Sequence, residues 1–109
     1  MNLNDLQKKM EEEFLIQLIY LLKHNKISLL RAKTATKELL SIPFNESFKK
    51  INSEVKNFVD KYPEFKDTLI SVLTTYEKKK KEEEILKKME KYIKVGKIDE
   101  ALQVAKKLK

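Results

Sequence analysis

The sequence predicts an all-α fold, a small bundle of about five helices with a long fourth helix and a C-terminal helical hairpin. Only one Gly and two Pro occur in 109 residues, whereas sheet proteins need many turns built largely from such residues. Apolar residues recur at steps of three and four, the spacing of one helix face. Because 41% of the residues are apolar and 38% are charged, we expect a folded core under a charged surface, not a disordered chain.

Capping residues and helix breakers predict where the helices begin and end. Ser28 and Asn45 are N-cap candidates for the second and third helices, and Asp99 for the last. Pro63 stands near the tolerated first position of the fourth helix. Gly96 is a natural left-handed residue after that helix. The expected helices cover residues 4–24, 28–41, 45–61, 63–95 and 98–108.

A charged run interrupts the apolar pattern of the fourth helix. Residues 77–84 contain neither an apolar residue nor a helix breaker. An unbroken helix over 63–95 would be roughly 50 Å long, which exceeds the radius of gyration of about 13 Å of a compact 100-residue domain. It therefore either projects or bends within the charged run and returns to the core. We accordingly divide the single domain into a bundle, 1–76, and a charged continuation with a basic hairpin arm, 77–109.

The helical spacing also predicts which side chains form the core. The run from Phe14 to Leu22 is apolar nearly all round, which suits a helix contacted on several sides or one that keeps an oligomer face. In the other helices a single stripe faces inward. The residues expected to be largely buried are Leu18, Leu22, Leu39, Phe48, Ile51, Val55, Phe58, Leu69 and Val72.

The stretch from Tyr92 through Gly96 to Ala105 resembles the turn of a tetratricopeptide-type helical hairpin. Gly96 stands at the turn, and Ala101 and Ala105 stand at packing positions. A solenoid needs about three stacked repeats, and the sequence has one such stretch. The resemblance therefore implies a single helical hairpin.

This sequence lacks the residues that several kinds of chemistry require. One His, no Cys and no Gly-rich phosphate loop argue against Cys/His zinc sites, Cys nucleophiles and nucleotide-binding loops. Glu occurs in two separate runs of three consecutive residues. The carboxylates of each run diverge, because successive helical residues point about 100° apart. We therefore expect no enzyme, no cofactor, no metal and no small-molecule substrate.

The compartment follows from the same composition. The longest apolar run, nine residues broken by Gln17, is shorter than the roughly 20 residues of a membrane span. The absence of Cys fits a reducing compartment. We expect a cytoplasmic protein that does not enter a membrane.

The net charge of +7 comes from 23 Lys and a single Arg, Arg31. Nucleic-acid readers favour Arg for bidentate contacts, whereas Lys acts as a hydrated point charge. The positive charge is concentrated in the arm, where residues 77–109 hold 12 Lys and 7 acids; residues 1–76 hold 11 Lys, one Arg and 10 acids. A Lys- and Glu-rich balance also occurs in hyperthermophile proteins and follows equally from an AT-rich genome.

These observations favour a non-catalytic helical protein–protein interaction protein that self-associates or binds a partner helix. The apolar residues beyond the charged run lie too far along a straight helix to reach the bundle, so a second copy or a partner helix should cover them. The sequence names neither the partner nor the pathway. The candidate interface residues are Ile85, Leu86, Met89, Tyr92, Ile93 and Leu102.

Two alternatives stay open. A nucleic-acid-associated protein would place phosphates on the lysines of the arm, and an enzyme could build its site together with a partner chain. The candidate nucleic-acid contacts are Lys78, Lys79, Lys80, Lys81, Lys87, Lys88 and Lys91.

Overall fold

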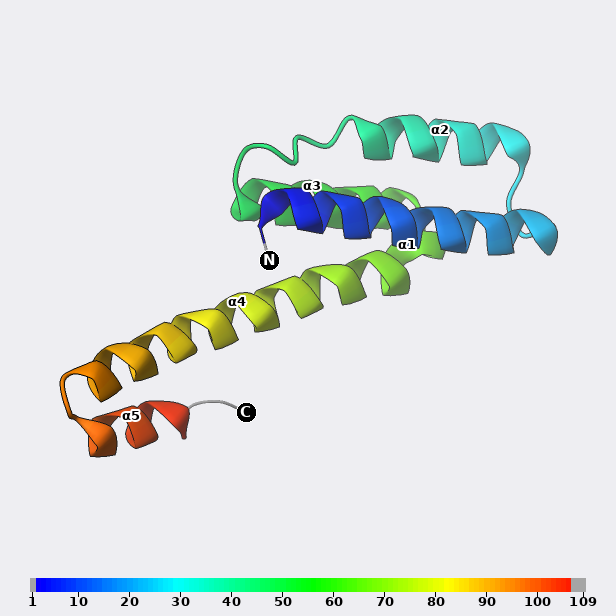
Figure 1. Ribbon diagram of the computed structural model, residues 1–109. Coiled ribbons are helices and arrows are strands. Elements are labelled where there is room, and N and C mark those ends of the chain that lie inside the picture. The colour runs from blue at the N-terminus through cyan, green and yellow to red at the C-terminus, as the bar shows by residue number, and fades with distance from the viewer. Residues whose placement is uncertain (1, 107–109) are drawn as a thin grey trace. The chain divides into compact units, whose positions relative to one another are not determined.

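The computed structural model describes residues 2–106 and confirms the all-α fold class, with 83% of these residues helical and no strand among them (Figure 1). Five α-helices and one short 3-10 helix follow one another along the chain. Their bounds are α1 Leu3–Lys23, α2 Leu29–Leu40, α3 Phe48–Lys61, η1 Pro63–Phe65, α4 Lys66–Lys94 and α5 Ile98–Ala105.

Side-chain caps fix the starts of the first helices. The Asn2 side chain accepts a hydrogen bond from the Asp5 backbone at 2.9 Å, and the Asp5 carboxylate accepts one from the Asn2 backbone, which forms a capping box. Ser28 caps α2 as the sequence predicts. The expected cap of α3 is wrong by two residues, because a turn at Pro43 takes up Asn45 and Ser47 caps the helix instead.

The breakers act where the sequence places them. Pro63 opens η1 directly after α3, and α4 then continues without interruption through the charged run to Lys94. Gly96 follows with a φ of 76°, the left-handed conformation that favours glycine. Lys97, not Asp99, holds the N-cap position of α5, so Asp99 lies in its first turn. The expected end of this helix at residue 108 lies outside the described residues.

The chain divides into two compact units between Thr74 and Thr75, and α4 passes through the division. The first unit contains α1, α2, α3, η1 and the first part of α4. The second unit contains the rest of α4 and α5. Each has its own set of packed side chains.

An aromatic cluster forms the centre of the first unit. Phe14 of α1 lies 4.6 Å from Phe65 and 6.1 Å from Phe58, centroid to centroid. Phe58 in turn lies 5.0 Å from Tyr62. Such tilted and edge-on ring contacts are favourable beyond the area that they bury. The Pro63 turn thereby brings two aromatic residues of the α3–η1 segment onto the middle of α1.

Six of the nine predicted core residues are buried and three are half-buried. Within the run from Phe14 to Leu22 the buried positions are Phe14 and Leu21, which leaves Leu18 and Leu22 at the border of the covered face. Phe48 is half-buried in the first turn of α3. The six buried residues are Leu39, Ile51, Val55, Phe58, Leu69 and Val72.

In the second unit, α5 folds back along the end of α4 (Figure 1). The Lys97 backbone donates to the Tyr92 carbonyl oxygen at 2.8 Å, a bond that closes the helix end around the left-handed Gly96. Ala101 is 1% exposed, and its small side chain lets the two helices approach closely. The helical hairpin predicted from the sequence is confirmed.

Candidate partner interface

The six predicted interface residues separate into an inner and an outer group. Ile85, Met89 and Tyr92 are half-buried, and their spacing of four and three residues puts them on one stripe of α4. Leu86 and Ile93 lie one residue further round, seven positions apart, and are 52% and 54% exposed. The structure thus places the outer residues on an adjacent, open stripe. Leu102 of α5 is exposed as well.

Two further exposed apolar residues belong to the same surface. Val95 and Ile98 flank the Gly96 turn and are at least as exposed as Leu86. The sequence-based site left them out, although two apolar residues on either side of a turn Gly were a usable signal. We call the exposed apolar residues of this unit the hairpin surface: Leu86, Ile93, Val95, Ile98 and Leu102.

A hollow of about 280 Å³ lies between the end of α4 and α5. It is lined by Ile85, Lys88, Lys91 and Tyr92 from α4 and by Val104 from α5. This volume is close to the lower limit of about 300 Å³ for small-molecule pockets. It is large enough to accept one apolar side chain of a partner, with two ammonium groups available to acidic neighbours of that side chain.

The seven candidate nucleic-acid lysines are all exposed on α4. Lys78 to Lys81 are consecutive, and because successive residues point about 100° apart, their ammonium groups spread around the helix. Acidic residues precede and follow this run. Lys80, Lys87 and Lys91, which are seven and four residues apart, nevertheless share one face of α4. Only part of the set therefore lies where it could follow a phosphate backbone.

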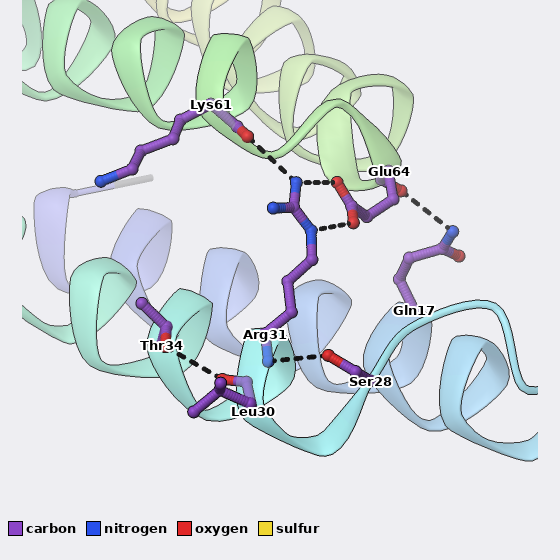
Figure 2. Close-up of polar contacts among 7 residues, drawn as sticks. All are labelled: Gln17, Ser28, Leu30, Arg31, Thr34, Lys61 and Glu64. Atoms are coloured by element: carbon purple, nitrogen blue, oxygen red, sulfur yellow. Dashed lines mark hydrogen bonds and ion pairs between the residues drawn. The ribbon is translucent and has the colours of Figure 1, made fainter.

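The only Arg of the chain holds the first unit together (Figure 2). The Arg31 guanidinium donates to both carboxylate oxygens of Glu64, at 2.6 and 2.9 Å, and to the Lys61 carbonyl oxygen at 3.1 Å. It also lies over the Tyr62 ring, 4.7 Å from the centroid. Gln17 of α1 donates to the Glu64 carbonyl oxygen at 3.3 Å. We call Arg31, Glu64 and Tyr62 the arginine clamp.

Electrostatics at the clamp follow from these contacts. The hydrogen bond from Arg31 lowers the pKa of Glu64 and raises that of Arg31. Burial raises the pKa of the Tyr62 hydroxyl, and a hydrogen bond with Glu38 adds to the shift. Glu38 accepts a further hydrogen bond from Lys61 Nζ, which lowers the Glu38 pKa. Each of these groups already has a partner inside the fold, so the cluster stabilises the α2–α3–η1 junction.

A second hollow of about 230 Å³, between α2 and α3, contains two carboxylates, and Glu38 is already paired with Lys61. Within residues 2–106, no three His, Asp or Glu side chains are placed to share a metal ion. No helix in this part of the chain is both long and apolar enough to cross a membrane.

No protein-family model, curated protein or solved structure matches the chain.

Proposed function

We propose that this protein is a non-catalytic interaction module whose hairpin surface binds a helix of a partner protein or of a second copy. The observation that carries the proposal is the exposure of the apolar residues at the end of α4 and on α5. Five of them, the hairpin surface, are each more than half exposed within the unit Thr75–Lys109. Exposed apolar patches of this kind mark interaction sites in folded proteins.

The geometry supports a helical partner. The outer stripe of α4 and the exposed side of α5 offer apolar positions at helical spacing, with the hollow at Ile85, Tyr92 and Val104 beside them. An amphipathic helix binds such a surface through apolar residues that are three, four and seven positions apart. Each newly covered Leu or Ile side chain would contribute roughly 1 kcal/mol, because about half of it is already buried.

The marginal stability of the second unit is a second reason to expect a bound helix on the hairpin surface. Two helices alone bury little apolar area, and small units of this kind are marginal without further cover. Among the described residues, no ion pair joins α5 to α4. A bound helix would therefore stabilise the hairpin in addition to being recognised by it.

The test removes apolar surface without touching buried residues. We expect the double variant Leu86→Ser and Ile93→Ser to fold normally and to lose the partner that the unaltered protein captures from its native lysate. Mass spectrometry identifies that partner, and titration with the purified partner measures the loss. The matched control is Leu29→Ser with Leu40→Ser, two apolar residues of α2 that are even more exposed. Equal capture by all three proteins contradicts the proposal, and so does the absence of both a captured partner and self-association that depends on Leu86 and Ile93.

The nucleic-acid alternative has a separate signature. If phosphates bind the arm, affinity for duplex DNA or RNA falls linearly with the logarithm of salt concentration, with a slope of about −0.9 per phosphate neutralised on B-DNA. Changing Lys87, Lys88 and Lys91 to Gln would then reduce the slope by about one for each lost contact. Binding that depends on Leu86 and Ile93 and little on salt supports the protein partner.

A further inference from the structure

A second exposed apolar face lies in the first unit, on the side of α1 opposite the aromatic core. Phe14 and Leu21 face inward and are buried, whereas Ile16 is 61% exposed and Ile19 is 53% exposed. Leu15 and Tyr20 flank them and are also exposed. Glu12 and Lys23 lie on the same face at its two ends, because eleven residues span about three full turns of helix. We call these six residues the α1 face: Glu12, Leu15, Ile16, Ile19, Tyr20 and Lys23.

The α1 face is symmetric about one point of the helix, midway between Gln17 and Leu18. Ile16 and Ile19 are equally far from that point, and so are Leu15 and Tyr20. Glu12 and Lys23 are equally far from it too, with opposite charges. A two-fold axis through this point would pair each residue with its counterpart on an antiparallel copy of the helix.

We propose that the α1 face forms an antiparallel homodimer interface, in which Glu12 of each copy faces Lys23 of the other. In this register Ile16 packs on the second copy's Ile19 at the centre of the contact, and Leu15 and Tyr20 lie along its two edges. Both copies contribute the same surface, so the contact is closed and involves exactly two chains. The interface is distinct from the hairpin surface and does not depend on the proposed function.

The charges around the face fit a second copy of this chain. Glu12 and Lys23 are exposed and form no ion pair with any residue from 2 to 106. The neighbouring Lys9 is already neutralised by Glu13, with 3.1 Å between Nζ and Oε1. Lys26, which follows the helix, lies over the Tyr20 ring of its own chain at 5.4 Å. In this register, therefore, the two unpaired charges of the α1 face, Glu12 and Lys23, form ion pairs between the copies.

Tyr20 is held in place before any partner arrives. Its ring lies 4.4 Å from that of His24, centroid to centroid, in addition to the contact with Lys26. A side chain ordered in the free chain loses less conformational entropy on association. Because one helix facing one helix covers less than the roughly 800 Å² per partner of a standard interface, we expect a dissociation constant roughly in the tens to hundreds of micromolar.

Charge reversal tests the register directly. In Glu12→Lys both symmetric ion pairs become repulsive, and the same holds for Lys23→Glu. Each variant should raise the dimer dissociation constant about five- to tenfold in sedimentation equilibrium at low salt, where surface charges are least screened. The double variant E12K/K23E restores both pairs and should recover the affinity of the unaltered chain. An equimolar mixture of the two single variants should also recover it, because every cross-pair is then attractive.

Two uncharged variants complete the experiment. Ile16→Ser removes both central contacts and should weaken dimerisation more than about tenfold, while Leu40→Ser, which removes an equally exposed residue of α2, should leave it unchanged. Circular dichroism establishes that each variant stays folded. The proposal is overturned if the full chain is monomeric at several hundred micromolar, if the double variant or the mixture fails to recover dimerisation, or if Leu86→Ser abolishes it as strongly as Ile16→Ser.

Discussion

The two ends of α4 have opposite surroundings although they belong to one helix. Near its start, Leu69, Val72 and Leu73 are buried in the first unit. Near its end, Ile85 and Met89 are only half-buried, and Ile93 is more than half exposed. The apolar content of the two ends is similar, so the difference reflects how many other helices each end contacts. The start of α4 shares its unit with α1, α2, α3 and η1, whereas its end shares a unit only with α5.

This difference separates residues that fix the fold from residues that are free to bind. In the first unit, helix contacts are reinforced by the aromatic cluster and by the arginine clamp. In the second unit, apolar residues exceed what one short helix can cover. Removing a buried side chain of the first unit should therefore reduce stability, whereas removing an exposed apolar side chain of the second unit should reduce association.

The largest effect should come from the aromatic centre. Phe58→Ala removes a nearly buried ring that contacts Phe14, Tyr62 and Phe65, and we expect a loss of about 3–5 kcal/mol in the free energy of unfolding. Urea denaturation followed by circular dichroism measures it. A loss below about 1 kcal/mol would mean that Phe58 faces solvent in solution, which contradicts the assigned phase of α3.

The comparison within α4 can be tested with a matched pair of variants. Leu69→Ala removes a fully buried side chain and should cost about 2–5 kcal/mol of unfolding free energy. Ile93→Ala removes an exposed one and should stay within about 0.5 kcal/mol of the unaltered protein. Denaturation of both under the same conditions checks the contrast, and equal losses would mean that the end of α4 is as well covered as its start.

The arginine clamp should give an intermediate effect. Arg31→Lys keeps the positive charge but loses the two-pronged bond to Glu64 and the flat contact with the Tyr62 ring. Because the Arg31 side chain is partly exposed, we expect a loss of only about 1–2 kcal/mol in unfolding free energy. Lys33→Arg on the same helix is the control, because it measures the effect of exchanging Lys and Arg at an exposed position outside the clamp. An unchanged denaturation midpoint for Arg31→Lys would show that the positive charge alone provides the stabilisation, without the two-pronged bond or the ring contact.

The smallest expected effect is the loss of stability at low pH that depends on Glu64. The hydrogen bond from Arg31 lowers the pKa of Glu64 in the folded state, so the unfolded chain takes up this proton first as the pH falls. The contribution of Glu64 is therefore present above its ordinary pKa and is lost as the pH falls towards the lowered one. Urea midpoints of Glu64→Gln and the unaltered protein should therefore converge as the pH falls below the ordinary pKa of a glutamate. A Glu64→Gln offset that persists at low pH would contradict this assignment.

Periodicity and chain breakers determined most of the helices. Pro63 lacks a backbone N–H and fixes its own φ, and Gly96 adopts a left-handed conformation that other residues avoid. Both therefore act locally, and the boundaries they predict are those observed. The buried stripe of α3, with Ile51, Val55 and Phe58, was equally readable, because only one face of that helix is apolar.

Tertiary structure decided what local pattern left open. In α1 the run from Phe14 to Leu22 is apolar on all sides, so spacing alone could not say which face the core would take; α3 and η1 cover Phe14 and leave Ile16 and Ile19 exposed. The pairing of Arg31 with Glu64, 33 residues apart, likewise depends on how two helices meet. Local sequence sets dihedral preferences and shared faces, whereas the choice between two apolar faces is made by the neighbours that arrive to bury one of them.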